Sequence, residues 1–224
     1  MPDAIRGRLI TLEGIDGAGK STHLPWLGEL LSQDGKPVWI TREPGGTPLG
    51  ERLRELLLRE PMAHVTEALL MFAARREHCE REIWPRLEQG TWVLCDRFTD
   101  ATFAYQGGGR GIPAERVAMA EKLATGGLLP ELTLLFDLPA GAARKRGKSP
   151  KRAARGAVDR LDAEELAFYE LVRRGFLDRA AADPRRFRNV DSSGDKEATA
   201  AAVRATLQPL VDAETARASP GARA

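Results

Sequence analysis

A glycine-rich loop near the start of the chain carries residues that could hold phosphates. Gly14-Ile-Asp-Gly-Ala-Gly-Lys20-Ser21-Thr22 has the spacing G-x-x-x-x-G-K-[ST], with an apolar run before it and a helical pattern after it. Glycines let backbone N–H groups wrap around phosphates at a helix N-terminus, where the dipole favours anions. Lys20 would reach the β- and γ-phosphates of ATP, and Ser21 would place its hydroxyl on Mg²⁺. The residues expected to bind ATP are Gly14, Ile15, Asp16, Gly17, Ala18, Gly19, Lys20, Ser21 and Thr22.

A second apolar run, Trp92-Val-Leu-Cys95, ends in Asp96 followed by Arg97. An acid at the carboxyl end of a parallel strand lies beside the loop of the first strand, where ligands bind in open α/β sheets. Asp96 could therefore hold Mg²⁺, directly or through water, and Arg97 could bind a phosphate with its planar fork. The alternative is that Asp96 only caps the following turn.

Strand-like and helix-like segments alternate along the chain. Short apolar runs without clean alternation indicate strands covered on both faces, at 9–12, 38–41, 92–95, 132–136 and, more weakly, 187–190. Helical periodicity or boundary signals occur at 24–31, 49–57, 65–89, 113–124, 163–182 and 196–211. The pattern predicts an α/β fold of P-loop NTPase type, with a parallel five-stranded sheet flanked by helices. We expect one domain over 1–213 and a disordered tail over 214–224.

A basic segment interrupts the last third of the chain. Residues 144–160 contain eight basic residues and one acid, with almost nothing to bury. Such a run is often a solvated loop. Beside an ATP site it could equally be a mobile lid that brings positive charge to the phosphates.

Composition narrows the partners and the compartment. The formal net charge of +2 is too small to indicate nucleic acid or a membrane as the main partner. Cys79 and Cys95 form neither a disulfide framework nor a metal-binding spacing. The first residues lack a secretory signal, and no apolar run is long enough to cross a membrane. We therefore expect a cytoplasmic protein.

Six motifs, in order, resemble those of bacterial thymidylate kinases, which belong to the P-loop nucleoside monophosphate kinases. They are GIDGAGKST at 14–22, TREPGGTPLGE at 41–51, LLMFAARREH at 69–78, DRF at 96–98, AYQGGGRG at 104–111 and ARGAVDR at 154–160. The resemblance implies phosphorylation of dTMP to dTDP with ATP and Mg²⁺, a step in dTTP synthesis for DNA replication. It also implies a homodimer formed through the long helix at 65–89.

The same resemblance implies which residues bind the acceptor. Arg42 and Arg97 would bind the dTMP phosphate, and Phe72 would stack on thymine. Arg76, one turn further on the same helix face, would donate a hydrogen bond to a base carbonyl. Taken alone, Phe72 could be a core residue and Arg76 a solvated helix charge.

Three further residues complete the implied acceptor site. Tyr105 would press against the deoxyribose and leave no room for a 2′-hydroxyl. Gln106 would contribute to the base pocket, and Asp16 would approach the sugar or the site of transfer. Without the resemblance, Tyr105 and Gln106 could simply organise the loop before the following glycines.

The resemblance also assigns the arginines that stabilise the transition state. One class of the family has an arginine in the glycine-rich loop at the position of Gly17, so this chain falls in the class that uses lid arginines. Arg155 and Arg160 match the A-R-G-x-x-D-R pattern, and Arg152 is a weaker candidate. The expected catalytic residues are Lys20, Asp16, Arg97, Arg155 and Arg160.

Two other functions remain open from the residues. A different nucleoside or nucleotide kinase would share the same scaffold. A nucleotide-dependent switch protein would hydrolyse slowly and ignore an acceptor, but such proteins usually carry an N-K-x-D motif, which this sequence lacks.

Overall fold

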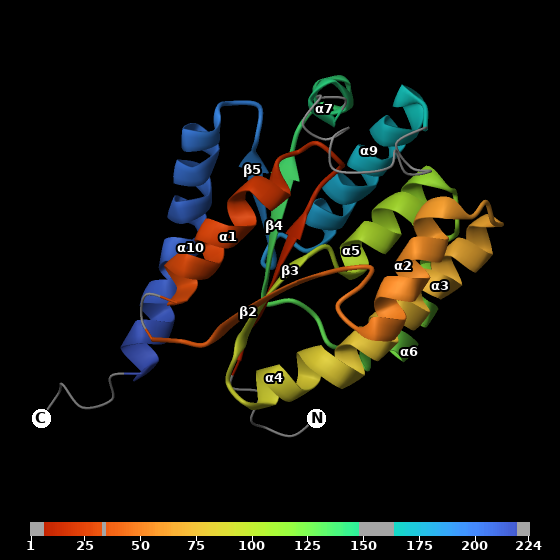
Figure 1. The fold of residues 1–224 in the computed structure, drawn as a ribbon. Helices are drawn as coiled ribbons and strands as arrows, with labels where there is room; N and C mark the ends of the chain where they lie inside the picture. Colours follow the sequence, from red (N-terminus) through yellow and green to blue (C-terminus); the bar gives the residue numbers. More distant parts are fainter. Residues whose placement is uncertain (1–6, 33–34, 148–163, 219–224) are drawn as a thin grey trace, which may run out of the picture.

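The computed structural model describes residues 7–32, 35–147 and 164–218 (Figure 1). At its centre lies a five-stranded parallel sheet with the order β2-β3-β1-β4-β5. This confirms the predicted fold class. The strands are β1 (Leu9–Glu13), β2 (Val38–Arg42), β3 (Trp92–Asp96), β4 (Leu132–Asp137) and β5 (Phe187–Asp191).

Each strand runs one residue beyond its predicted end, and the added residue is charged. These residues are Glu13, Arg42, Asp96, Asp137 and Asp191. The runs before them are buried in the central strands β1, β3 and β4, where helices cover both faces of the sheet, whereas the edge strands β2 and β5 are partly exposed. Since all five strands are parallel, the five charges lie along one edge, where parallel α/β sheets bind ligands.

Helices flank the sheet on both sides. In Figure 1, α1 and α10 lie on one side, and α3, α4, α5, α6 and α9 lie on the other. The helical segments are α1 (Lys20–Ser32), α2 (Pro48–Arg59), α3 (His64–His78), η1 (Cys79–Ile83), α4 (Trp84–Glu88), α5 (Thr99–Thr102), η2 (Phe103–Gly109), α6 (Ala114–Thr125), α7 (Ala140–Gly147), α9 (Leu166–Ala182) and α10 (Lys196–Ala218).

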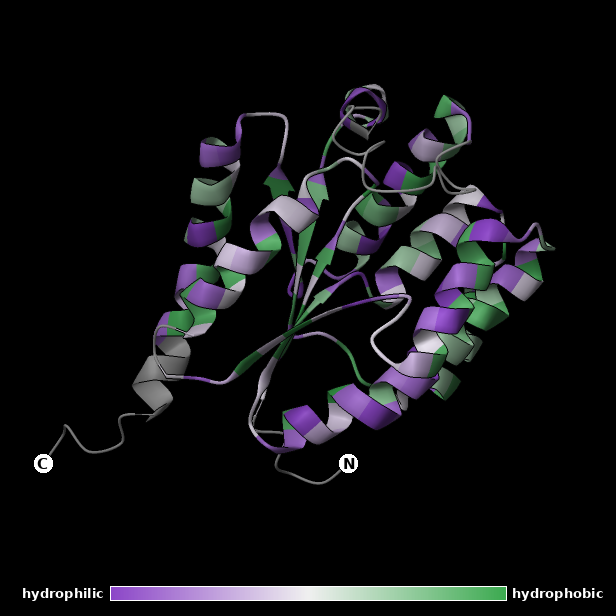
Figure 2. Ribbon diagram, in the orientation of Figure 1, coloured by the Kyte–Doolittle hydropathy of each residue, from purple (hydrophilic) through white to green (hydrophobic). Residues whose placement is uncertain are grey.

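The main core fills the space between the sheet and its helices. Leu12 and Leu134 of the sheet are fully buried, as are Phe176 of α9 and Val203 of α10, which all belong to one cluster. Figure 2 shows the strands as the most apolar part of the ribbon, with hydrophilic residues spread along the outer helices. None of the helices in the described ranges is long and apolar enough to span a membrane.

The long helix predicted at 65–89 is continuous but contains a wider π-helical turn, η1. Trp84 N–H donates to the carbonyl of Cys79, five residues back, just before Pro85. Proline has no N–H to donate and its ring crowds the preceding turn, which accounts for the departure from α-helical geometry at this point.

Three helical segments differ from the predictions in ways that bear on the expected tail, loop and lid. The last helix continues to Ala218 rather than ending at Val211, so 214–218 of the expected disordered tail are helical; its alanine-rich sequence favours this. Residues 99–109 form α5 and η2, so Tyr105 and Gln106 lie on a π-helical turn and not in a loop. The first four residues of the expected lid, 144–147, belong to α7.

Candidate active site

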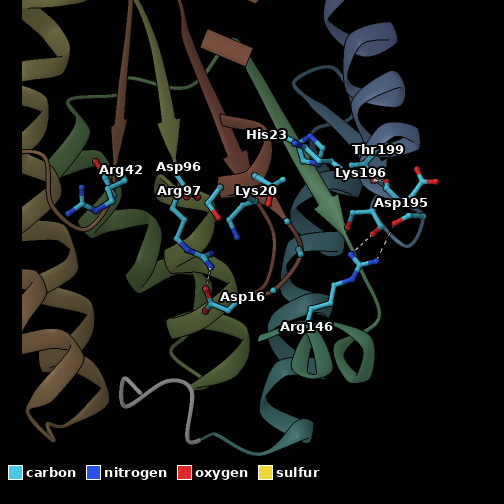
Figure 3. Close-up of a pocket in the computed structure, with 18 of the residues that line it drawn as sticks. Asp16, Lys20, His23, Arg42, Asp96, Arg97, Arg146, Asp195, Lys196 and Thr199 are labelled. Atoms are coloured by element: carbon cyan, nitrogen blue, oxygen red, sulfur yellow. Dashed lines mark hydrogen bonds and ion pairs between the residues drawn. The ribbon is translucent and has the colours of Figure 1, made fainter. Parts of the chain in front are cut away.

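A cleft of about 710 Å³ opens at the carboxyl edge of the sheet. Its walls come from the glycine-rich loop, the ends of β2 and β3, helix α7 and the start of α10 (Figure 3). The lining residues are Asp16, Gly17, Ala18, Gly19, Lys20, Ser21, Thr22, His23, Arg42, Glu43, Arg54, Asp96, Arg97, Arg146, Ser192, Gly194, Asp195, Lys196 and Thr199.

The glycine-rich loop is packed too tightly for larger residues at two positions. Gly14 has a φ of +132°, and a Cβ there would lie 2.3 Å from the carbonyl oxygen of Phe136. Gly17 has a φ of +86°, and its Cβ would lie 2.3 Å from the carbonyl oxygen of Ala143 in α7. The loop therefore depends on glycine both for its backbone conformation and for its close approach to β4 and α7.

Lys20 is folded against its own loop. Its Nζ donates to the carbonyl oxygens of Gly14 at 2.8 Å and Ile15 at 3.2 Å. Burial and the nearby Arg97 guanidinium lower the pKa of Lys20 to about 8. An incoming phosphate would favour the charged ammonium and compete for these hydrogen bonds.

Arg97 lies between the glycine-rich loop and Tyr105 of η2. Its guanidinium donates to Asp16 Oδ1 at 2.9 Å, to the carbonyl oxygen of Gly14 at 2.9 Å and to the Tyr105 hydroxyl at 3.2 Å. Tyr105 in turn donates to Asp16 Oδ2 at 2.9 Å. Although burial opposes it, Tyr105 and Asp16 hold the pKa of Arg97 well above its usual value, so Arg97 is a fixed cation.

A smaller hollow of about 70 Å³ adjoins the main cleft. The two share Asp16, Glu43, Arg54 and Arg97. The remaining lining of the hollow is mostly apolar and comes from the loop after β2 and from α2, α3, α5 and η2. These residues are Pro44, Leu57, Leu58, Glu67, Met71, Ala101 and Tyr105.

Arg75, and not Arg76, is the buried arginine of α3. Its side chain is 2% exposed and donates to Glu43 Oε2 at 2.6 Å, Thr102 Oγ1 at 3.0 Å and the Phe98 carbonyl at 2.9 Å. Arg76 is 45% exposed, pairs with Glu80 and lies over the Trp84 ring. The expected placement of Arg76 in the acceptor site is therefore wrong.

Phe72 is also turned away from the hollow. It packs with Phe103, Val117 and Ala124 in a separate cluster, whereas Met71 lines the hollow. Met71 and Arg75 are four residues apart and lie one turn apart on the helix. The predicted pair, Phe72 and Arg76, has the same spacing but is shifted by one residue, which rotates it by about 100°.

The structure brings the other predicted residues of the acceptor site close to the cleft. Arg42 lines it and pairs with Glu51 at 2.8 Å. Gln106 is buried beside the hollow, where its Nε2 donates to Glu67 Oε1 at 2.7 Å. Its Oε1 has no hydrogen-bond partner among the described residues. The proposed lid residues Arg152, Arg155 and Arg160 lie outside the described residues.

Two further arginines that line the cleft were missed by the sequence analysis. Arg146 of α7 lines the cleft and donates to the carbonyl oxygens of Ser192, Ser193 and Gly194 (Figure 3). It lies within the basic run, but that pattern does not single it out. Arg54 lines both cavities and donates to the Pro44 carbonyl at 2.9 Å. The sequence feature that could have identified Arg54 is its position on α2, the helix that directly follows the TREPGGT motif.

Comparisons with known proteins agree on one family. The thymidylate kinase family model matches residues 12–203. The chain is 52% identical over 207 residues to the thymidylate kinase of Bordetella petrii, covering 92% of this chain and 98% of that protein. It is 54% identical over 191 residues to the thymidylate kinase of Cupriavidus necator, covering 84% and 92%. A crystal structure of thymidylate kinase from Ehrlichia chaffeensis matches with a TM-score of 0.72 and 34% identity, covering 90% of this chain and 98% of that one.

Proposed function

Because this chain belongs to the thymidylate kinase family, we propose that its cleft brings ATP and dTMP together so that the γ-phosphoryl group passes to dTMP. The products are dTDP and ADP, which makes the chain an ATP:dTMP phosphotransferase in dTTP synthesis. One observation carries this assignment at the level of the site: Arg97 and Asp16 line both the cleft around Lys20 and the adjoining hollow.

The chemistry needs positive charge more than it needs a base. A nucleotide phosphate has a second pKa near 6, so it is largely a dianion at pH 7 and can attack without losing a proton. The obstacle is repulsion between two highly negative phosphates. Positioned cations lower that barrier, and Lys20, Arg42, Arg54 and Arg97 all line the cleft.

On the donor side, the loop from Gly14 to Thr22 would hold the triphosphate with its backbone N–H groups and with Lys20. Arg146 fixes the chain from Ser192 to Gly194, which forms the far wall of the cleft. We assign the ATP base to the end of the cleft beside Ser192 and Gly194, because the phosphates would lie in the glycine-rich loop, which is closer to Arg97.

Ser21 and Asp96 suit a magnesium ion. Both line the cleft and offer oxygen ligands, which Mg²⁺ prefers. Asp96 Oδ1 is buried and has no hydrogen-bond partner among the described residues, as a carboxylate reserved for a cation would be. When bound, the ion would neutralise phosphate charge, and Asp96 would hold it directly or through water.

On the acceptor side, we assign the dTMP phosphate to Arg97 and Arg42. Asp16 keeps Arg97 and the Tyr105 hydroxyl in fixed positions, with both hydrogen bonds at 2.9 Å. Tyr105, buried beside the hollow, would press against the deoxyribose. A ribose 2′-hydroxyl would then have little room, which favours deoxyribonucleotides.

The base would enter the hollow between α2 and α3. Met71 supplies apolar surface there, and the free carbonyl of Gln106 could accept the N3–H of thymine. Arg75, and not Arg76, is the arginine of α3 on this side, since it donates to Glu43, which lines the hollow. Arg155 and Arg160 are still assigned to the lid that stabilises the transition state, on the strength of the A-R-G-x-x-D-R motif alone.

We also propose a homodimer that forms through α3 and α6, which pack against each other. Their outer surfaces expose four large apolar side chains, at Val65, Leu69, Met119 and Leu123. Leu69 is 59% exposed and Leu123 81%, and an adjoining group of such residues is a common sign of a protein interface. A cytoplasmic location is proposed as well, and the free thiols of Cys79 and Cys95 suit a reducing compartment.

A steady-state assay tests the proposed activity. ADP formation is measured with ATP and Mg²⁺ in the presence of dTMP, dUMP, CMP, AMP or GMP, and without an acceptor. The proposal requires dTMP to be the best acceptor. ADP formation that is independent of every acceptor would instead indicate a nucleotide-dependent switch, and a preference for another monophosphate would indicate a different kinase.

A further inference from the structure

The turn that carries Arg97 has an unusual backbone conformation. Arg97 has a φ of +73°, and it is the one non-glycine residue with positive φ in the described ranges. L-residues with a Cβ avoid this region for steric reasons, so such a conformation persists only where surrounding contacts hold it. The surroundings of Arg97 must therefore contain those contacts.

Four hydrogen bonds to the backbone of Arg97 and Phe98 hold this turn. The Cys95 thiol donates one of them to the Arg97 carbonyl at 3.0 Å. Arg97 N–H donates to the Leu12 carbonyl at 3.0 Å. Phe98 N–H donates to Glu13 Oε1 at 2.7 Å, and the Phe98 carbonyl accepts from Arg75 at 2.9 Å. Both backbone polar groups of Phe98 are thus bound by buried side chains, directly after the strained residue.

Glu13 is placed to act on this turn and has few other roles. It is the last residue of β1, is 0% exposed and lies one residue before the glycine-rich loop. Its Oε2 has no hydrogen-bond partner among the described residues, so within these residues the carboxyl group of Glu13 makes one hydrogen bond, to Phe98. A carboxyl group is costly to bury, and this one makes its bond beside the conformation that most needs support.

We propose that Glu13 is a positioning residue, which accepts the N–H of Phe98 and thereby keeps Arg97 in the left-handed conformation that aims its guanidinium at the acceptor phosphate. This inference rests on the proposed function of Arg97. Glu13 itself touches neither substrate. The turn requires an oxygen at this place that accepts the Phe98 N–H, and it does not require a negative charge on Glu13.

Two substitutions at Glu13 separate the hydrogen bond from the charge. Glu13→Gln removes the ionisable group but keeps an acceptor oxygen at the same reach. Glu13→Asp keeps an ionisable carboxyl group but withdraws its oxygens by about 1.5 Å, the length of one carbon–carbon bond. Burial, and then Asp100, raise the pKa of Glu13 to about 8, so a neutral amide also resembles the carboxyl form that prevails at pH 7.

Glu131 provides a matched control at the other end of the same strand. Its Oε2 accepts the N–H of Leu9, the first residue of β1, at 2.8 Å. Glu131→Asp therefore makes the same chemical change to a carboxyl group that also accepts a backbone N–H, but at the end of β1 away from Arg97.

The experiment measures kcat and KM for dTMP and for ATP in these three variants, and repeats Glu13→Asp in an Arg97→Ala background. We expect Glu13→Asp to lower kcat/KM for dTMP at least tenfold, equal to about 1.4 kcal/mol, with KM for ATP changed less than about twofold. The kcat/KM for dTMP of Glu13→Gln should stay within about threefold of the wild-type value, and that of Glu131→Asp within about twofold. In the Arg97→Ala background, Glu13→Asp should lower kcat/KM for dTMP by less than about a further twofold, because Glu13 acts through Arg97.

Either of two results would overturn the proposal. A loss in Glu13→Gln as large as in Glu13→Asp would mean that the charge is needed, and an equal loss with and without Arg97 would mean that Glu13 acts elsewhere. Should Glu13→Asp fail to fold, a tenfold loss in Glu13→Gln alone is enough to reject it, and retained activity supports it. A wild-type protein without dTMP-dependent turnover would instead reject the proposed function.

Discussion

Replacing Arg75 with methionine should destabilise the protein far more than the same change at Arg76. Methionine keeps most of the side-chain volume but removes the charge and the donors. Arg75→Met would leave Glu43, 3% exposed, without the guanidinium that now lies 2.6 Å from it. Removing one partner of a buried ion pair costs about 3–5 kcal/mol, because the remaining charge stays buried without its counter-ion. Glu43 would keep its hydrogen bond to His78 at 3.0 Å.

The matched change at Arg76 breaks only a surface interaction. Arg76 and Glu80 are 45% and 55% exposed, and exposed pairs contribute about 0–1 kcal/mol. The contact of Arg76 with the Trp84 ring adds about 0.5–1 kcal/mol at an exposed site. At roughly 2–4 °C per kcal/mol for a chain of this size, we expect a fall in Tm of about 6–20 °C for Arg75→Met and only a few degrees for Arg76→Met.

Thermal and urea unfolding of both variants, followed by circular dichroism at several pH values, measure this difference. Although burial opposes it, Arg75 and His78 hold the pKa of Glu43 below its usual value of 4.5. A lowered pKa contributes stability that is present above about pH 4.5 and lost as the pH falls through the native value. The deficit of Arg75→Met should therefore shrink in acid, when Glu43 becomes neutral. Equal stability of the two variants at pH 7 would refute the burial of Arg75.

Three further results are expected. Arg155→Ala should lower kcat at least about tenfold, or more than about 1.4 kcal/mol of barrier, with little change in KM for dTMP; an unchanged kcat would assign 144–160 to a solvated loop. The thymine methyl is worth about 0.8 kcal/mol of burial, so dUMP should react only a fewfold less well than dTMP, and AMP or GMP outcompeting dTMP would contradict the assigned hollow. Leu69→Glu should shift the protein from dimer to monomer in sedimentation velocity, whereas a wild-type monomer would exclude the α3–α6 interface.

The three central strands could be predicted from the sequence because they are buried on both faces and leave nearly continuous apolar runs. The glycine-rich loop and Asp96 could be located for a related reason, since chemistry at the ends of parallel strands follows those runs directly. Only the last residue of each strand was missed. Those residues are charged, and an apolar pattern ends before them even though the hydrogen-bond ladder continues.

The acceptor side was harder to predict because it depends on the rotational phase of α3. The resemblance implied that Phe72 stacks on thymine and that Arg76, one turn later, binds the base. Both Phe72 and Met71 can be buried, and the sequence does not show which neighbour each will meet. Tertiary packing determines which face of α3 points toward the hollow. It places Phe72 against Phe103 and Val117 and turns Arg75 inward to Glu43.

A crystal structure with dTMP, Mg²⁺ and a non-hydrolysable ATP analogue tests the central arrangement most directly. The triphosphate should lie in the loop from Gly14 to Thr22 with Lys20 on its phosphates. The dTMP phosphate should contact Arg97, and its base should occupy the hollow lined by Met71. A dTMP molecule bound away from Arg97, or a loop without phosphate at saturating analogue, would contradict the account.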